Sequence, residues 1–145
     1  MMKVSVQFNE NEGTFTGKFS EKGKIKIGSS LEGEIPTPKQ LVLLAVGTCS
    51  AIDVVSILQK KRQKISSYEI EISGESREEH PKSFSKIHIH HILKGENLST
   101  KAVEQAIELS DKKYCSVAAT LRPTATITTS FEILQDEVSQ TQQAS

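Results

Sequence analysis

One apolar segment near the middle of the chain limits the folds that this sequence can adopt. Thr37, Pro38 and Gln40 form a capping box with proline at the first helical position, and they predict a helix that begins at Pro38. The helix can run to about Arg62. Its first half, residues 41–46, is apolar on every side, whereas its second half is amphipathic. We therefore expect other parts of the protein to enclose the first half.

The residues before this helix have the alternating pattern of short, half-buried strands. Residues 9–13 and 21–23 have the composition of turns, and residues 28–36 form a loop rich in glycine and serine. The apolar positions of the three predicted strands are Val4, Val6 and Phe8, then Phe15 and Phe19, then Ile25 and Ile27. This pattern predicts a meander of about three antiparallel strands.

The residues after the helix predict two strands, a second helix and a last strand. The predicted elements are strands at 68–74 and 84–93, a helix capped by Ser99 or Thr100 that ends near Lys112 and Lys113, a helical turn at 116–120, and a strand at 124–134. This grouped order indicates an α+β fold rather than a doubly wound sheet. A chain of 145 residues has the length of one domain, expected over residues 1–134. The polar residues 135–145 are expected to form a disordered tail.

Charge and hydropathy exclude several classes of partner. The 18 basic and 18 acidic residues cancel, so no net field attracts nucleic acid or anionic lipid. The longest unbroken apolar run, residues 41–46, is far shorter than the ~20 residues that span a bilayer. Residues 1–13 lack the apolar core of a signal peptide. We expect a cytoplasmic protein that binds neither nucleic acid nor membrane.

Two cysteines, Cys49 and Cys115, are the candidate reactive residues, and two are too few for a four-thiolate metal site. Cys49 lies about eleven residues into the predicted helix among small neighbours, which let another backbone segment or a ligand come close. A buried cysteine in a helix can equally be an inert small hydrophobe. Cys115 follows two lysines and is placed to open a short helix, so its surroundings could favour a thiolate.

Two sequence motifs surround these cysteines. The first reads Pro38-Lys39-Gln40-Leu41 and leads to residues 43–53 around Cys49. The second reads Tyr114-Cys115-Ser116-Val117-Ala118-Ala119-Thr120-Leu121. Together they resemble the OsmC/Ohr family of osmotically inducible and organic hydroperoxide resistance proteins. The order of predicted elements matches this family from Met1 to about Ile133.

The resemblance implies an α+β fold of two antiparallel sheets around a long central helix, in an intertwined homodimer. It also implies a cysteine-based peroxidase that needs no cofactor. By this analogy Cys49 attacks an organic hydroperoxide and becomes a sulfenic acid, and Cys115 condenses with it to a disulfide. A dithiol reductant then restores both thiols.

The sequence departs from the family where the thiolate is activated. Well-characterised members carry Glu ten residues before the helix cysteine, and this Glu holds an Arg of the N-terminal strands beside the thiolate. Here that position is Lys39, and no arginine precedes Arg62, so the chain resembles a divergent OsmC-like branch. Another cation must act, and Arg122 is the favoured candidate. The other candidates are Lys112, Lys113, His88 and His90.

Asp53 and three histidines have simpler interpretations. Asp53 is interpreted as a hydrogen-bond acceptor, although close to Cys49 it would oppose ionisation of the thiol. His88 and His90 lie on one face of the predicted strand and His91 on the other. The first two are interpreted as part of a solvated face rather than a metal site, because no third ligand has convincing spacing.

Two functions from different classes remain open. The first is a thiol peroxidase for organic hydroperoxides, which both cysteines favour. The second is a non-catalytic dimeric module of the same fold, serving in binding or redox regulation, which Lys39 favours.

Overall fold

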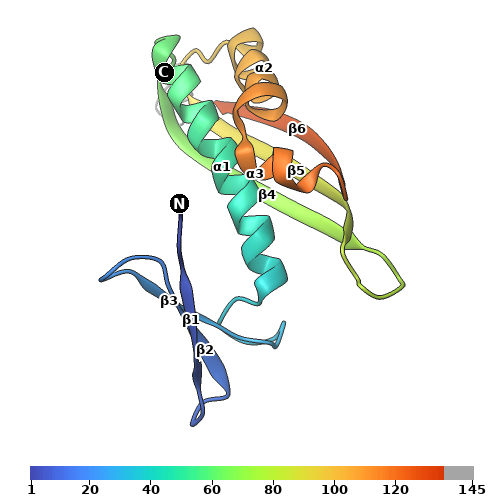
Figure 1. Cartoon of the computed structure of the whole chain (residues 1–145). Coiled ribbons are helices and arrows are strands. Elements are labelled where there is room, and N and C mark those ends of the chain that lie inside the picture. The colour runs from blue at the N-terminus through green and yellow to red at the C-terminus, as the bar shows by residue number, and fades with distance from the viewer. Residues whose placement is uncertain (136–145) are drawn as a thin grey trace. The chain divides into compact units, whose positions relative to one another are not determined.

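Residues 1–135 are described by the computed structural model of this chain (Figure 1). Its elements are β1 (Ser5–Asn9), β2 (Thr14–Lys18), β3 (Lys24–Ile27), α1 (Pro38–Lys60), β4 (Ile65–Ser76), β5 (Phe84–Gly95), α2 (Thr100–Leu109), the π-helical turn η1 (Ser110–Tyr114), α3 (Ser116–Leu121) and β6 (Thr126–Gln135). This order confirms the α+β class. Gln135, placed in the tail by the sequence, closes β6, and the rest of the expected tail, residues 136–145, lies outside the described residues.

The chain divides into two compact units, residues 1–42 and the residues from Leu43 onward. The single domain expected over residues 1–134 stays a prediction. In the first unit, β1, β2 and β3 form the predicted antiparallel meander. Phe8 lies opposite Phe15, with ring centroids 5.2 Å apart. Val4 and Phe19, predicted as strand residues, lie just outside β1 and β2.

Local hydrogen bonds fix both ends of α1. The Thr37 N–H donates to Gln40 Oε1 at 2.9 Å and the Gln40 N–H donates to Thr37 Oγ1 at 3.3 Å, which confirms the capping box. At the other end Arg62 adopts the left-handed conformation, with φ of 58°. The Gln63 N–H then donates to the Leu58 carbonyl at 2.9 Å, as in a Schellman motif.

The second sheet has the order β4-β5-β6. β4 and β5 form the predicted antiparallel hairpin, whereas β6 runs parallel to β5, with Ile127 beside Ile87. The expectation of two purely antiparallel sheets is therefore wrong for this pair. The physical reason is the long connection between β5 and β6, which contains α2, η1 and α3. Parallel strands need a crossover of this kind, because the chain must return to the starting end of the sheet before the next strand begins.

The core of the second unit lies between α1 and this sheet. Alternate residues of β5, including Ile87, Ile89 and Leu93, are buried. Val46 of α1 is in the same buried cluster as Ile87 and Ile89, with Cys115 and Ala118. Gly47 allows a close approach between helix and sheet, because a Cβ there would lie 2.6 Å from Cγ1 of Ile72 on β4. This close approach places α1 against β4. The buried cluster that contains Val46 and Ala118 also places α1 beside α3.

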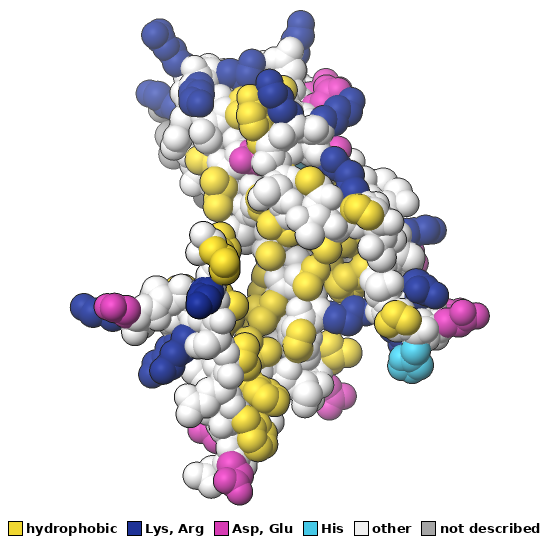
Figure 2. Space-filling view, in the orientation of Figure 1, with side chains coloured by type: hydrophobic (Ala, Val, Ile, Leu, Met, Phe, Trp, Pro, Cys, Tyr) yellow, Lys and Arg dark blue, Asp and Glu magenta, His cyan; other side chains and the backbone are white. Residues whose placement is uncertain are grey.

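Two apolar side chains of α1 are exposed, Leu44 by 54% and Ile52 by 64%. The expected enclosure of residues 41–46 stays a prediction. Hydrophobic side chains are visible along α1 in the space-filling view (Figure 2). An 18-residue window of α1 has a mean hydropathy of 2.3, long and apolar enough to cross a membrane by length and composition alone. Val54 and Leu58 of this helix are fully buried against protein.

Candidate active site

The structure brings both cysteines together. Cys49 lies on α1 and Cys115 immediately precedes α3, and both are free thiols. Their Sγ atoms and a carboxylate oxygen of Asp53 all lie within 4.8 Å of one another. Cys49 is half-buried, whereas Cys115 is 4% exposed. The pair can therefore react with each other after a small movement, with Cys49 the more accessible partner.

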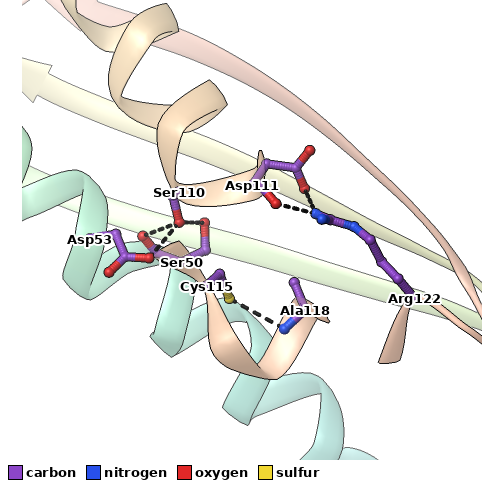
Figure 3. A network of polar contacts seen from close by, with 7 residues as sticks. All are labelled: Ser50, Asp53, Ser110, Asp111, Cys115, Ala118 and Arg122. Carbon is purple, nitrogen blue, oxygen red and sulfur yellow. Dashed lines mark hydrogen bonds and ion pairs between the residues drawn. The ribbon is translucent and has the colours of Figure 1, made fainter. Parts of the chain in front are cut away.

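The turn η1 places Cys115 at this position. The Cys115 N–H donates to the Ser110 carbonyl at 2.8 Å, a bond five residues back that defines a π-helical turn. The chain then turns into extended backbone, and Cys115 becomes the N-cap of α3, where its Sγ accepts the Ala118 N–H at 3.4 Å (Figure 3). The prediction that Cys115 opens a short helix is confirmed.

The pKa of the Cys49 thiol reflects opposing influences. Burial raises this pKa, but a hydrogen bond from the backbone of Val117 and others from the side chains of Cys115 and Ser116 lower it. The net pKa lies below the ordinary value of a cysteine. The negative charge of Asp53 works against ionisation, as the sequence predicts for a nearby carboxylate. Hydrogen-bond donors at the start of α3 therefore stabilise the Cys49 thiolate.

Cys115 has the opposite character. Burial, together with the neighbouring Cys49 and Asp53, raises the pKa of its thiol to about 11, although the Ala118 N–H works to lower it. The expectation that its surroundings favour a thiolate is therefore wrong, because the buried thiol donates its hydrogen to Cys49 instead. Cys49 is therefore the thiol that ionises more readily, and Cys115 is the thiol that stays protonated.

Asp53 is held by a hydroxyl group that the sequence does not reveal. Ser110, fully buried, donates to Asp53 Oδ2 at 2.8 Å, and Ser50 Oγ lies 3.4 Å from the same hydroxyl (Figure 3). The interpretation of Asp53 as a hydrogen-bond acceptor is confirmed. No pattern in the sequence marks Ser110, because it points inward only through the π-helical geometry of η1.

The structure does not bring Arg122, the favoured activating cation, to the cysteines. Its guanidinium pairs with Asp111 Oδ1 at 2.5 Å and also donates to the Asp111 carbonyl (Figure 3). It is absent from the groups that shift the pKa of Cys49 among the described residues. Its role at the thiolate stays a prediction without support from this geometry.

The other candidate cations have different partners. Lys112 pairs with Glu108 at 2.7 Å, and Lys113 lies 5.4 Å from the centroid of the Tyr114 ring. His88 Nδ1 lies 2.6 Å from the hydroxyl of Thr128 on β6. None of these groups contributes to the lowered pKa of Cys49 in the part of the chain that is described.

His90 and His91 lie on opposite faces of β5, as predicted. His90 Nδ1 is 2.6 Å from the Ser130 hydroxyl of β6, so this face is half-buried and hydrogen-bonded rather than freely solvated. His91 is fully buried, with Nδ1 2.5 Å from the Tyr68 hydroxyl. Burial lowers the pKa of His91 to about 4, so its ring is neutral at physiological pH.

The fold and the paired thiols define a class of α+β proteins with two close cysteines, one on a long helix that packs on a mixed sheet and one at the start of a short helix. The model of the OsmC-like protein family matches residues 31–130, more than half of the chain. The chain belongs to the OsmC/Ohr family.

Relatives and solved structures agree with this assignment. Protein YhfA of Escherichia coli is 43% identical over 121 residues, covering 83% of this chain and 90% of that protein. A hypothetical protein from Aquifex aeolicus is 35% identical in sequence, with a TM-score of 0.84 over 94% of this chain and 98% of its own. The organic hydroperoxide resistance protein OhrB of Bacillus subtilis shares the fold at 13% identity, with a TM-score of 0.62 over 91% of this chain and 98% of its own.

Proposed function

We propose that this protein is a cysteine-dependent peroxidase that reduces organic hydroperoxides in defence against oxidative stress. The observation that carries the proposal is the pair of sulfurs within 4.8 Å of each other and of unequal acidity. Thiol peroxidases need one ionised nucleophile and one nearby thiol to trap its oxidised form. The name of the structural neighbour OhrB, an organic hydroperoxide resistance protein, gives further support.

The first step is attack of the Cys49 thiolate on the outer oxygen of the hydroperoxide. The S–O bond forms as the O–O bond breaks, so Cys49 becomes a sulfenic acid and the substrate leaves as an alkoxide, which takes a proton to become the alcohol. The donors that stabilise the thiolate, the Val117 N–H and the Ser116 hydroxyl, also lie beside the reacting sulfur. They supply the role that an arginine plays in other members of the family.

The second step regenerates the enzyme. The Cys115 thiol attacks the Cys49 sulfenic acid, a disulfide forms and water leaves. A dithiol reductant, which we propose as the partner, then exchanges with the disulfide and returns both cysteines to thiols while it is itself oxidised. Both cysteines of the site come from one chain, so the resolving step needs no second subunit.

We also propose that the protein acts as a homodimer in the cytoplasm. Apolar side chains of β1 and β2 are exposed in one chain, Phe8 by 56% and Val6 by 63%, and Leu44 and Ile52 of α1 are exposed as well. Exposed apolar side chains of this kind favour burial against a second copy of the chain. A reducing compartment would keep both thiols free between turnovers.

The alternative is a non-catalytic dimeric module in binding or redox regulation. Lys39 stands in place of the family glutamate, and no arginine precedes Arg62. In addition, the ion pair with Asp111 occupies Arg122. The alternative requires that Cys49 react no faster with hydroperoxide than an ordinary exposed thiol.

Loss of an alkyl hydroperoxide in the presence of a dithiol reductant separates these functions. The wild type is expected to turn over many equivalents, and Cys49→Ser none. Cys115→Ser should lose activity progressively during turnover, because its Cys49 sulfenic acid lacks the resolving thiol and further hydroperoxide converts it to sulfinic acid. Equal, slow loss with the wild type and with Cys49→Ser would refute the peroxidase and favour the binding module.

A further inference from the structure

The cluster of Cys49, Asp53 and Cys115 has the composition of a metal site as well as of a peroxidase site. We propose that the reduced protein binds one divalent zinc ion per chain through these three side chains. Bound zinc is also expected to block reduction of hydroperoxides. That expectation rests on the proposed function, whereas zinc binding itself does not. The sequence predicts no metal because His88 and His90 have no third ligand of convincing spacing, whereas here Cys115 joins Cys49 and Asp53 from a distant segment.

Helix geometry supplies the first two ligands. Cys49 and Asp53 are four residues apart on α1 and therefore lie on one face of the helix, one turn from each other. Cys115 reaches the same point from the N-cap of α3. Two thiolates and one carboxylate are ligands that zinc accepts, and three protein ligands with a fourth position open to water are typical of accessible zinc sites.

The separations are close to those of a filled site. The three ligand atoms lie within 4.8 Å of one another. With Zn–S bonds of about 2.3 Å and Zn–O bonds of about 2.1 Å, ligand atoms on one tetrahedral zinc stand roughly 3.5–4 Å apart. Side-chain movements of less than about 1 Å would therefore bring the three ligand atoms to these separations. Cys49 and Asp53 are half-buried, so an ion can enter from solvent.

A buried hydroxyl already orients the carboxylate. Ser110, with no exposed surface, donates to Asp53 Oδ2 at 2.8 Å, and the π-helical bond between Cys115 and Ser110 holds that serine in place. A carboxylate has several lone pairs on two oxygens, so Asp53 can accept this hydrogen bond and still bind zinc. Hydrogen bonds of this kind to a ligating carboxylate tune metal affinity by about 10-fold to 100-fold.

Metal binding and peroxide reduction exclude each other at this site. Zinc bonds to both sulfurs as thiolates, so its entry displaces the hydrogen on Cys115 to solvent. The bound ion then occupies the electron pair with which Cys49 would attack a hydroperoxide. Formation of the Cys49–Cys115 disulfide removes both sulfur ligands, so oxidation releases the ion.

The test is competition for zinc between the reduced full-length protein and a chromophoric chelator, in the absence of peroxide. The wild type is expected to take one zinc ion per chain. Asp53→Asn and Ser110→Ala should each weaken binding at least 10-fold, while Glu104→Gln, an exposed carboxylate on α2, should bind like the wild type. Cobalt(II) in place of zinc should give sulfur-to-metal charge-transfer absorption with the reduced protein, and none with protein whose Cys49–Cys115 disulfide was formed before the metal was added.

Several results would overturn the inference. The inference fails if the folded, reduced wild type does not retain zinc against the chelator. Equal losses in Asp53→Asn and Glu104→Gln would place the ion elsewhere, and so would a cobalt spectrum without sulfur ligation. If zinc binds as stated but zinc-free protein does not reduce hydroperoxides, the proposed function fails while the metal site stands. The reverse pair of results removes only the metal site.

Discussion

Replacement of Asp53 by asparagine removes the negative charge nearest to the proposed nucleophile while keeping an acceptor for the Ser110 hydroxyl. The carboxylate oxygen lies within 4.8 Å of Cys49 Sγ. At that separation and in the high dielectric of a half-exposed site, two unit charges repel by about 1 kcal/mol. This energy corresponds to about a fivefold change in the equilibrium between thiol and thiolate, since about 1.4 kcal/mol is a factor of ten. We therefore expect Asp53→Asn to lower the pKa of Cys49.

The assay is the pH dependence of thiol alkylation in the Cys115→Ser background, where Cys49 is the only cysteine. Because only the thiolate reacts, the rate rises with pH through the pKa of Cys49, and the profile of Asp53→Asn should shift to lower pH. Below the pKa the alkylation rate should increase up to about fivefold, which is the ratio of thiolate fractions for a change of this size in the equilibrium.

Glu104→Gln on α2 is the matched control, because it removes the same charge from an exposed position. It should leave the profile unchanged. If Asp53→Asn leaves the profile in place or shifts it to higher pH, the carboxylate does not oppose ionisation of Cys49, and the electrostatic account of the site is wrong.

Three further changes test other parts of the account. Lys39→Glu alone should raise peroxidase kcat/KM by less than about threefold, because a carboxylate can position an arginine only if one is near and none precedes Arg62 in the sequence. A gain of a hundredfold would show that the activating cation has been overlooked. Gly47→Ala should destabilise the fold by about 1–3 kcal/mol in urea unfolding, because its Cβ would lie 2.6 Å from Cγ1 of Ile72; unchanged stability would mean that α1 and β4 are not so close. Light scattering should give twice the chain mass at micromolar concentration, and a monomer would refute the proposed dimer.

Local rules were sufficient to predict much of this fold. The capping box at Thr37 and Gln40 depends on neighbouring residues only, so the start of α1 follows from the sequence. The alternation in β4 and β5 likewise predicts their faces, and His91 is buried opposite His90. The parallel pairing of β6 depends on the path of the whole crossover, so short-range patterns could not predict it.

The chemistry of the site was less accessible to sequence reasoning. The two cysteines are evident from the motifs, but which thiol ionises depends on where the donors of α3 point after the chain folds. The Val117 N–H and the Ser116 side chain act on Cys49 of another helix, whereas the Ala118 N–H donates to Cys115. Similarly, Ser110 enters the site only through the π-helical turn, and the ion pair with Asp111 turns Arg122 to a different partner.

The most direct test of the central claim is the intact mass of the reduced protein after one equivalent of an alkyl hydroperoxide. The wild type should lose two hydrogens as Cys49 and Cys115 form a disulfide. Cys115→Ser should gain one oxygen on Cys49 as sulfenic acid, and a second equivalent should add another oxygen as sulfinic acid, whereas Cys49→Ser should stay unmodified over the same time. Oxidation of both single variants at the same rate would contradict the account, because neither cysteine would then be selectively activated.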